Sequence, residues 1–265
     1  MKRIYKQGLI QLLYDNRVLL IISFLIMTFI SIQDRAIYGS INISIFDFVL
    51  LMYADHYNIM YFIYPIVFFI IAKDIRELSD IEILRYSNIF EFCAQKIIKF
   101  SIFILVYTFI IYAIRFIVGM GSFPFIYTIK PIEFDGINEV KYIFNLYAQY
   151  FSNGLIVVIS SILYVNLGFV FLYALLSYIN QKFSYNMMVG LGIVIYLMSY
   201  IGFKINTSSL SLVLFNNYLL IHQALFNNSL YVFALIIIIE ISTISFSFFK
   251  SYSLKRGNRD ESYRN

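Results

Sequence analysis

The sequence is poor in charged residues. Only 13% of its 265 residues are Asp, Glu, Lys or Arg, whereas 61% are hydrophobic. A water-soluble domain carries about a quarter charged residues, so this chain has too little polar surface to cover a soluble core of its size. The same hydrophobic content excludes intrinsic disorder. The composition is that of a membrane protein.

Cysteine, histidine and tryptophan are scarce or absent. The single cysteine, Cys93, cannot form an internal disulfide, and two distant histidines, His56 and His222, do not have the spacing of a metal site. Tryptophan is missing, while Ile, Phe, Tyr, Asn and Lys are used heavily. That bias is typical of an AT-rich genome and indicates a low-GC bacterium.

Catalytic motifs are also missing. The chain has no Gly-x-x-x-x-Gly-Lys-Ser/Thr phosphate loop, no His-Glu-x-x-His and no Gly-x-Ser-x-Gly. We therefore expect no ATP hydrolysis by this chain, no catalytic residues, no metal and no cofactor of its own. The net charge of +5 is expected to face anionic lipid rather than nucleic acid.

What the sequence does contain is a series of long uncharged apolar runs. A segment that crosses a bilayer must satisfy its own backbone hydrogen bonds, so each run is expected to be a helix. We predict an all-α polytopic fold, a single transmembrane domain with six spans. The spans are placed at about 18–34, 57–72, 97–118, 154–178, 184–203 and 229–249. The first two are short for a core of about 30 Å, so flanking residues must extend them.

The basic residues fix the expected orientation. With these spans, 15 of the 20 Lys and Arg residues fall on the side of the N-terminus. The positive-inside rule then places both termini and the basic tail, 250–265, in the cytoplasm. Arg115, about 24 Å along the third helix from Lys99, is expected to reach the outer interface as an anchor.

Three segments are predicted to lie at the membrane surface. Residues 1–17 place Tyr5, Leu9, Leu12 and Leu13 on one face, which indicates an interfacial elbow helix; a plain extension of the first span is the alternative. The apolar stretches 36–53 and 207–226 are expected to be re-entrant or interfacial. If either one alone crossed the membrane, a basic segment that follows it would lie on the outer side, against the positive-inside rule. Full spans are the alternative there.

The most informative connection joins the second and third spans. Two capping-box patterns, one beginning at Ser79 and one at Asn88, predict a short helix at about 80–86 and a second helix from Ile89 into the third span. The short helix has an apolar ridge, Ile81 and Leu84, among charged neighbours. Such a ridge is suited to dock in a groove on a partner, and a solvated helix with no partner is the alternative.

A few polar and small residues lie inside the predicted spans. Glu240 is in the middle of the last span, where an ionisable group is a default functional candidate. It could line a pathway, pair with a basic group on another chain, or be a hydrogen-bonded structural residue. Asn166, Gly190 and Gly192 are expected mainly to serve helix packing, with a pathway role for Asn166 as the alternative.

Taken together, the elbow-like N-terminus, six spans, a cytosolic helix between spans two and three and an apolar non-spanning stretch before span six resemble the permease subunits of type-2 ATP-binding-cassette exporters. The small size and short outer loops look most like the bacteriocin-immunity and antimicrobial-peptide exporters. In that family the helix between spans two and three is a coupling helix that seats on a separate ATPase. The matching positions here are Ser79, Asp80, Ile81, Glu82, Leu84, Arg85 and Tyr86.

The resemblance implies a function and a set of partners. The chain would pair with a second permease, identical or a sister subunit, and with ATPase subunits that carry ATP and Mg²⁺. A hydrophobic or amphipathic substrate (a peptide, lipid or drug) would be moved outward. The alternatives are an ion-coupled carrier that uses Glu240 and an immunity or sensor protein that does not transport.

Overall fold

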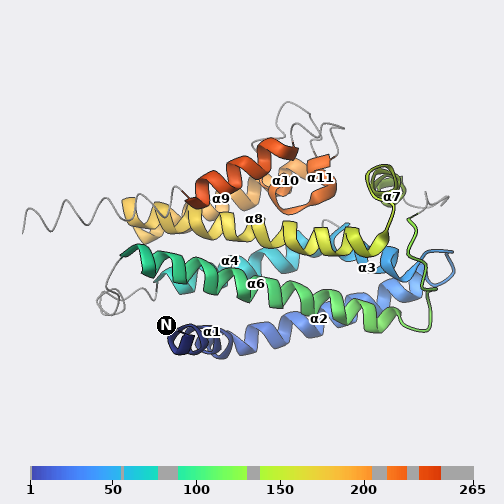
Figure 1. Cartoon of the computed structure of the whole chain (residues 1–265), viewed down its shortest axis with the longest axis horizontal. Coiled ribbons are helices and arrows are strands. Elements are labelled where there is room, and N and C mark those ends of the chain that lie inside the picture. Colours follow the sequence, from blue (N-terminus) through green and yellow to red (C-terminus); the bar gives the residue numbers. More distant parts are fainter. Residues whose placement is uncertain are drawn as a thin grey trace, which may run out of the picture.

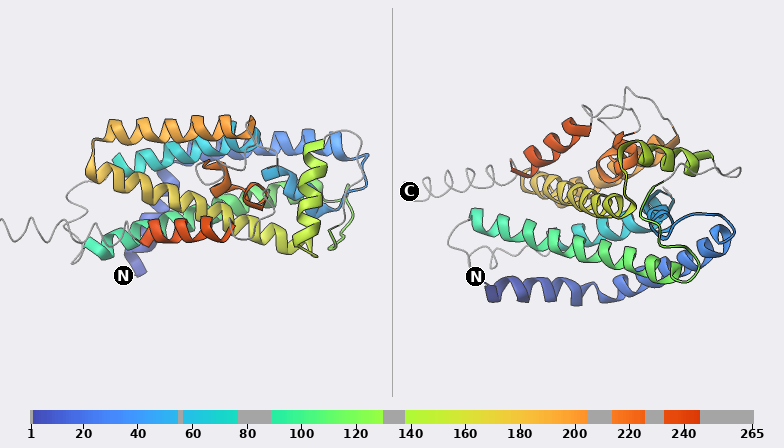
Figure 2. Two further views of the ribbon diagram at one scale, coloured as in Figure 1. Left: turned by 90° about the horizontal axis from the view of Figure 1, so that it is seen from above. Right: turned by 45° about the vertical axis from the view of Figure 1, so that its right-hand side comes forward.

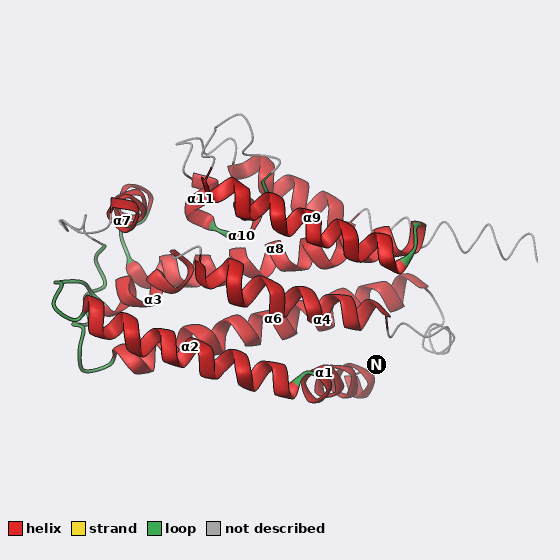
Figure 3. Cartoon of the chain, turned by 180° about the vertical axis from the view of Figure 1, so that it is seen from behind, coloured by secondary structure: helices red, strands yellow, loops and turns green. Residues whose placement is uncertain are grey.

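The structure is a computed structural model that describes residues 2–54, 57–76, 89–129, 138–204, 214–225 and 233–245. Within these ranges the chain is all-helical (Figure 3). Four helices are long and apolar enough to cross a membrane: Arg17–Tyr38, Asn58–Arg76, Gln95–Gly119 and Gly154–Lys182. The prediction of an all-helical chain with several helices able to cross a membrane is therefore confirmed.

The long helices lie side by side along the long axis of the molecule (Figure 1). Helices α6 (Ile89–Gly119) and α8 (Gly154–Lys182) form the central pair. Helix α2 (Arg17–Tyr38) packs against α6, while α4 (Tyr64–Arg76) and α9 (Tyr185–Lys204) pack against α8 and against each other. The start of α6 at Ile89 is the start that the Asn88 capping pattern predicts.

The two spans that looked short in the sequence are longer in the structure. Helix α2 has 22 residues, about 33 Å of helix, and includes Asp34 and Arg35 near its end. A π-helical segment, η1 (Asn58–Ile63), precedes α4, and the two together make a 19-residue helix. Flanking residues therefore supply the missing length. Two further apolar helices, Tyr185–Ile201 and Phe233–Ser245, are shorter.

Helix α1 (Lys2–Asp15) is separate from α2. In Figure 1 it is seen nearly end-on, whereas α2 lies across the page, so the chain turns between them. The turn is at Asn16, whose Nδ2 donates to the carbonyl of Leu12 at 2.8 Å. Leu12 is buried, and Leu9 and Leu13 pack against the core, so these three residues of α1 face the bundle.

In the described part of the chain, four short helices lie over the half of the bundle farther from the N-terminus (Figure 1). They are α3 (Ile45–Ala54), α7 (Asn138–Tyr150), α10 (Asn216–Leu219) and α11 (Ile221–Leu225). Helix α7, which the sequence reading missed, lies across the direction of the long helices (Figure 2). With ten residues, α3 is about 15 Å long, half the hydrocarbon core. The stretch 36–53 is thus the end of α2, a turn and α3, and not one spanning helix.

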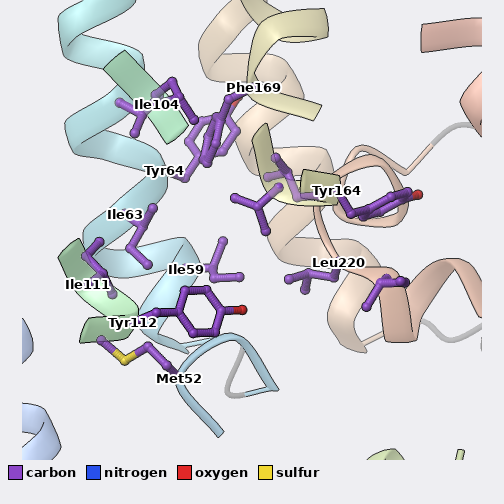
Figure 4. Packing of buried hydrophobic residues seen from close by; sticks show 14 of the residues in the cluster. Met52, Ile59, Ile63, Tyr64, Ile104, Ile111, Tyr112, Tyr164, Phe169 and Leu220 are labelled. Carbon is purple, nitrogen blue, oxygen red and sulfur yellow. The ribbon is translucent and has the colours of Figure 1, made fainter. Parts of the chain in front are cut away.

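Aromatic rings fill much of the core. Tyr64 lies beside Phe169 of α8 (Figure 4), with ring centres 6.4 Å apart, and its ring is 5.3 Å from that of Tyr196 on α9. A Cβ atom at Gly192 would collide with the ring of Phe68, whereas one at Gly190 would meet nothing within 4 Å. The predicted packing role therefore holds for Gly192, which lets α4 and α9 approach, and not for Gly190.

Candidate functional site: an ionic junction at the N-terminal end of the bundle

A buried carboxylate joins three helices at the end of the bundle near the N-terminus. Asp74, in the last turns of α4, is 6% exposed. Its Oδ1 accepts a hydrogen bond from Nζ of Lys99 on α6 at 2.7 Å, and Lys96 Nζ lies 3.8 Å from the same oxygen. Its Oδ2 accepts from the hydroxyl of Tyr173 on α8 at 2.7 Å. We call these four residues the Asp74 junction.

The junction is held in place by packing on one side and faces polar groups on the other. The Tyr173 ring stacks on Phe100, with ring centres 4.4 Å apart. Helix α1 closes the other side, where Nζ of Lys73 donates to the backbone oxygen of Asp15 at 3.0 Å. A polar cavity of about 100 Å³ between α1, α4 and α6 is lined by Asp74, Lys96 and Lys99. It is large enough for a few water molecules.

The junction lies between the two helices that flank residues 77–88. Helix α4 ends at Arg76 and α6 begins at Ile89, so the Asp74–Lys99 pair ties together the two helices that flank residues 77–88. A buried, hydrogen-bonded ion pair resists separation of its partners, because each charge left alone would be poorly solvated. A force applied to residues 77–88 would be passed to α4, α6 and α8 at once.

The predicted coupling helix, 79–86, lies outside the described residues. The capping patterns indicate this segment, but they do not indicate the Asp74 junction. The available signal was Asp74 itself, a carboxylate at the end of an apolar run, and Lys99, ten residues inside the next helix, which begins at Ile89. Their pairing could not be read from the sequence because 25 residues separate them.

Asn166 is a packing residue between the two central helices. Its Nδ2 donates to the backbone oxygen of Ser101 at 2.7 Å, and its Oδ1 accepts from the Ser101 hydroxyl at 3.0 Å. Both ends of the amide are used in bonding α8 to α6. This geometry favours the packing interpretation of Asn166 over a place in a transport pathway.

Glu240 is fully buried in the helix Phe233–Ser245. Within the described part of the chain, neither of its carboxyl oxygens has a hydrogen-bond partner. Its carboxyl group lies close enough to the phenol groups of Tyr164 on α8 and Tyr218 on α10 to interact electrostatically with both. Burial and, after it, the Glu240 carboxyl raise the pKa of Tyr218. The structure thus places Glu240 inside the protein, at a contact between three helices.

The prediction for Arg115 is wrong. Its side chain is 0% exposed and does not extend to the interface. Nη1 forms an ion pair with Asp34 of α2 at 2.6 Å, Nε donates to the carbonyl of Phe48 on α3 at 2.7 Å, and the guanidinium lies 4.3 Å from the Phe48 ring centre. Helix α3 covers this end of α6, and the arginine is enclosed as a result.

No protein family, no curated protein and no solved structure matches this chain.

Proposed function

We propose that this chain is the permease subunit of an ATP-binding-cassette exporter of the type-2 kind. It would form six spans with both termini in the cytoplasm, and α1 would be its interfacial elbow helix. Paired with a second permease and with separate ATPase subunits, it would move a hydrophobic or amphipathic substrate outward. Antimicrobial peptides are the substrate class that the resemblance favours.

The Asp74 junction is the observation that carries this proposal. A permease driven by another protein needs a docking element and a rigid path from it into the membrane. The ends of α4 and α6, on either side of residues 77–88, are tied by the 2.7 Å pair of Asp74 and Lys99 and bound to α8 through Tyr173. A carrier that works without a partner protein would not need an ion pair that fixes the ends of α4 and α6 around residues 77–88.

The direct test replaces the apolar ridge of the predicted docking helix. Ile81→Asp combined with Leu84→Asp is expected to abolish co-purification of the ATPase, because two carboxylates would be buried in the groove that receives the ridge. The candidate ATPase for this test is the product of a neighbouring gene that carries a phosphate-loop motif, tagged and co-expressed. Recovery of the permease from the membrane fraction checks insertion.

Ile83→Asp is the matched control, since Ile83 falls on the other side of the predicted helix from Ile81 and Leu84. It is expected to retain the ATPase. Retention of the ATPase by the double variant, or equal loss in both proteins, would show that the ridge is not the docking surface.

An ion-coupled carrier is the second candidate, and the burial of Glu240 favours it. A carboxyl group enclosed without a hydrogen-bond partner in the described chain has the surroundings of an ion- or proton-binding residue. The permease proposal expects Glu240→Gln to leave ATP-driven uptake of a fluorescent amphipathic peptide into inverted vesicles within about twofold. A carrier would lose uptake driven by an imposed proton gradient, and would show none with ATP alone.

A further inference from the structure

A deep groove runs between α4 and α9 on the surface of the bundle. Its volume is about 540 Å³, within the roughly 300–1,000 Å³ typical of small-molecule sites. On α4 it is lined from Tyr64 to Arg76, about 18 Å of helix. One leaflet of a bilayer core is about 15 Å deep. The groove therefore has the length of one leaflet and follows the direction of the helices.

The inner part of the groove is apolar and built by fixed rings. Tyr64 and Phe68 are stacked with ring centres 6.2 Å apart, and Tyr196 packs on Tyr64 from α9. The Tyr64 hydroxyl donates to the carbonyl of Gly192 at 3.4 Å. Because Phe68 abuts Gly192, the two walls are in direct contact at the back. A slot of this kind fits a hydrocarbon chain.

The mouth of the groove is positively charged. Lys73 and Arg76 occupy the last turn of α4 and line the groove at the end nearest α1, where Nζ of Lys73 also donates to the backbone oxygen of Asp15 at 3.0 Å. The Arg76 guanidinium lies 5.7 Å from the ring centre of Tyr185, the first residue of α9. Among the described residues the groove lining contains no acidic side chain, and the neighbouring Asp74 is turned to Lys99. An anionic group is the complement of this mouth.

We propose that this groove binds an anionic phospholipid from the leaflet on the N-terminal side, with its phosphate between Lys73 and Arg76 and an acyl chain along Phe68 and Tyr64. Basic clefts between membrane helices recognise lipid head groups in this way. The two cations account for the preference for an anionic head group, and the slot accounts for the preference for a lipid over free phosphate. This site does not depend on the proposed transport function.

The test measures lipid retained by the purified full-length chain, by native mass spectrometry after incubation with equal phosphatidylglycerol and phosphatidylcholine. The wild-type protein is expected to prefer phosphatidylglycerol. Lys73→Gln with Arg76→Gln is expected to lower that preference about 25-fold, at about fivefold for each cation. Ala72→Phe, which fills the groove and keeps both charges, is expected to reduce retention of both lipids.

Lys182→Gln is the matched control, because Lys182 is an exposed cation at the same end of the bundle, on α8, and does not line the groove. It is expected to leave the preference unchanged. The proposal fails if the double variant keeps the wild-type preference, if Lys182→Gln lowers it equally, or if inorganic phosphate alone is retained as strongly as the lipid. A loss of dimer with unchanged lipid retention would make the groove a contact between two copies and would also overturn it.

Discussion

Replacing Asp34 by Asn is expected to destabilise the protein by about 3–5 kcal/mol, because the fully buried guanidinium of Arg115 loses the carboxylate that balances its charge. The pair is short, at 2.6 Å, and only the Asp34 side is partly exposed, at 20%. Unfolding of the detergent-solubilised protein by increasing fractions of dodecyl sulfate measures the change.

Arg35→Gln is the matched control for Asp34→Asn. Arg35 is the next residue, is exposed, and donates to the carbonyl of Val118 at 3.3 Å; its replacement is expected to change stability by less than about 1 kcal/mol. Asp34→Leu with Arg115→Met, which removes both charges, is expected to cost less than Asp34→Asn alone. Equal effects of Asp34→Asn and Arg35→Gln would contradict the buried ion pair.

Asp74→Asn is expected to have an effect of similar size, about 3–5 kcal/mol, since Lys99 is only 13% exposed and would lose its anionic partner. The remaining amide oxygen can still accept from Tyr173, so the loss reports the charge rather than the hydrogen bond. The same dodecyl sulfate titration measures it. Under the proposed permease function, membranes that contain the variant and its ATPase are also expected to hydrolyse ATP without moving substrate, because α4 and α6 would no longer be held together by the ion pair.

Two further variants test whether the loss of stability comes from the Asp74–Lys99 ion pair or from any carboxylate near the polar cavity. Asp15→Asn changes an exposed carboxylate on α1 at the same polar cavity and is expected to shift stability by less than about 0.5 kcal/mol. Asp74→Asn with Lys99→Met is expected to be more stable than Asp74→Asn alone, because the Lys99 ammonium, which has lost the Asp74 carboxylate, is then removed as well. A double variant as unstable as the sum of its parts would show that Asp74 and Lys99 do not interact.

The periodicity and the apolar runs predicted the long helices well, because a helix in lipid needs continuous apolar sequence. The burial of Arg115 could not be predicted from the local sequence in this way. The position of this residue along α6 suggested exposure at the outer interface, but its exposure depends on α3, which folds over it and offers the Phe48 carbonyl. Contacts between segments 67 residues apart in sequence leave no trace in the local pattern of either segment.

Helix α7 was missed for a different reason. Ile143, Phe144 and Tyr147 recur at helical spacing and are buried, so the signal was present. It was hidden by the uncharged run that continues into α8, in which a surface helix and the following span look alike. The π-helical segment before α4 had no sequence signal at all, since one extra residue in a turn changes neither composition nor hydropathy.

The proposed permease function requires residues 79–86 to project into the cytoplasm and to receive work from another protein. The most direct test is a Ser79→Cys variant in a Cys93→Ser background, which leaves a single cysteine in the chain. Intact cells are treated with a membrane-impermeant maleimide, and inverted vesicles are treated in parallel. The account predicts labelling in the inverted vesicles and none in the intact cells; labelling in intact cells alone would contradict it.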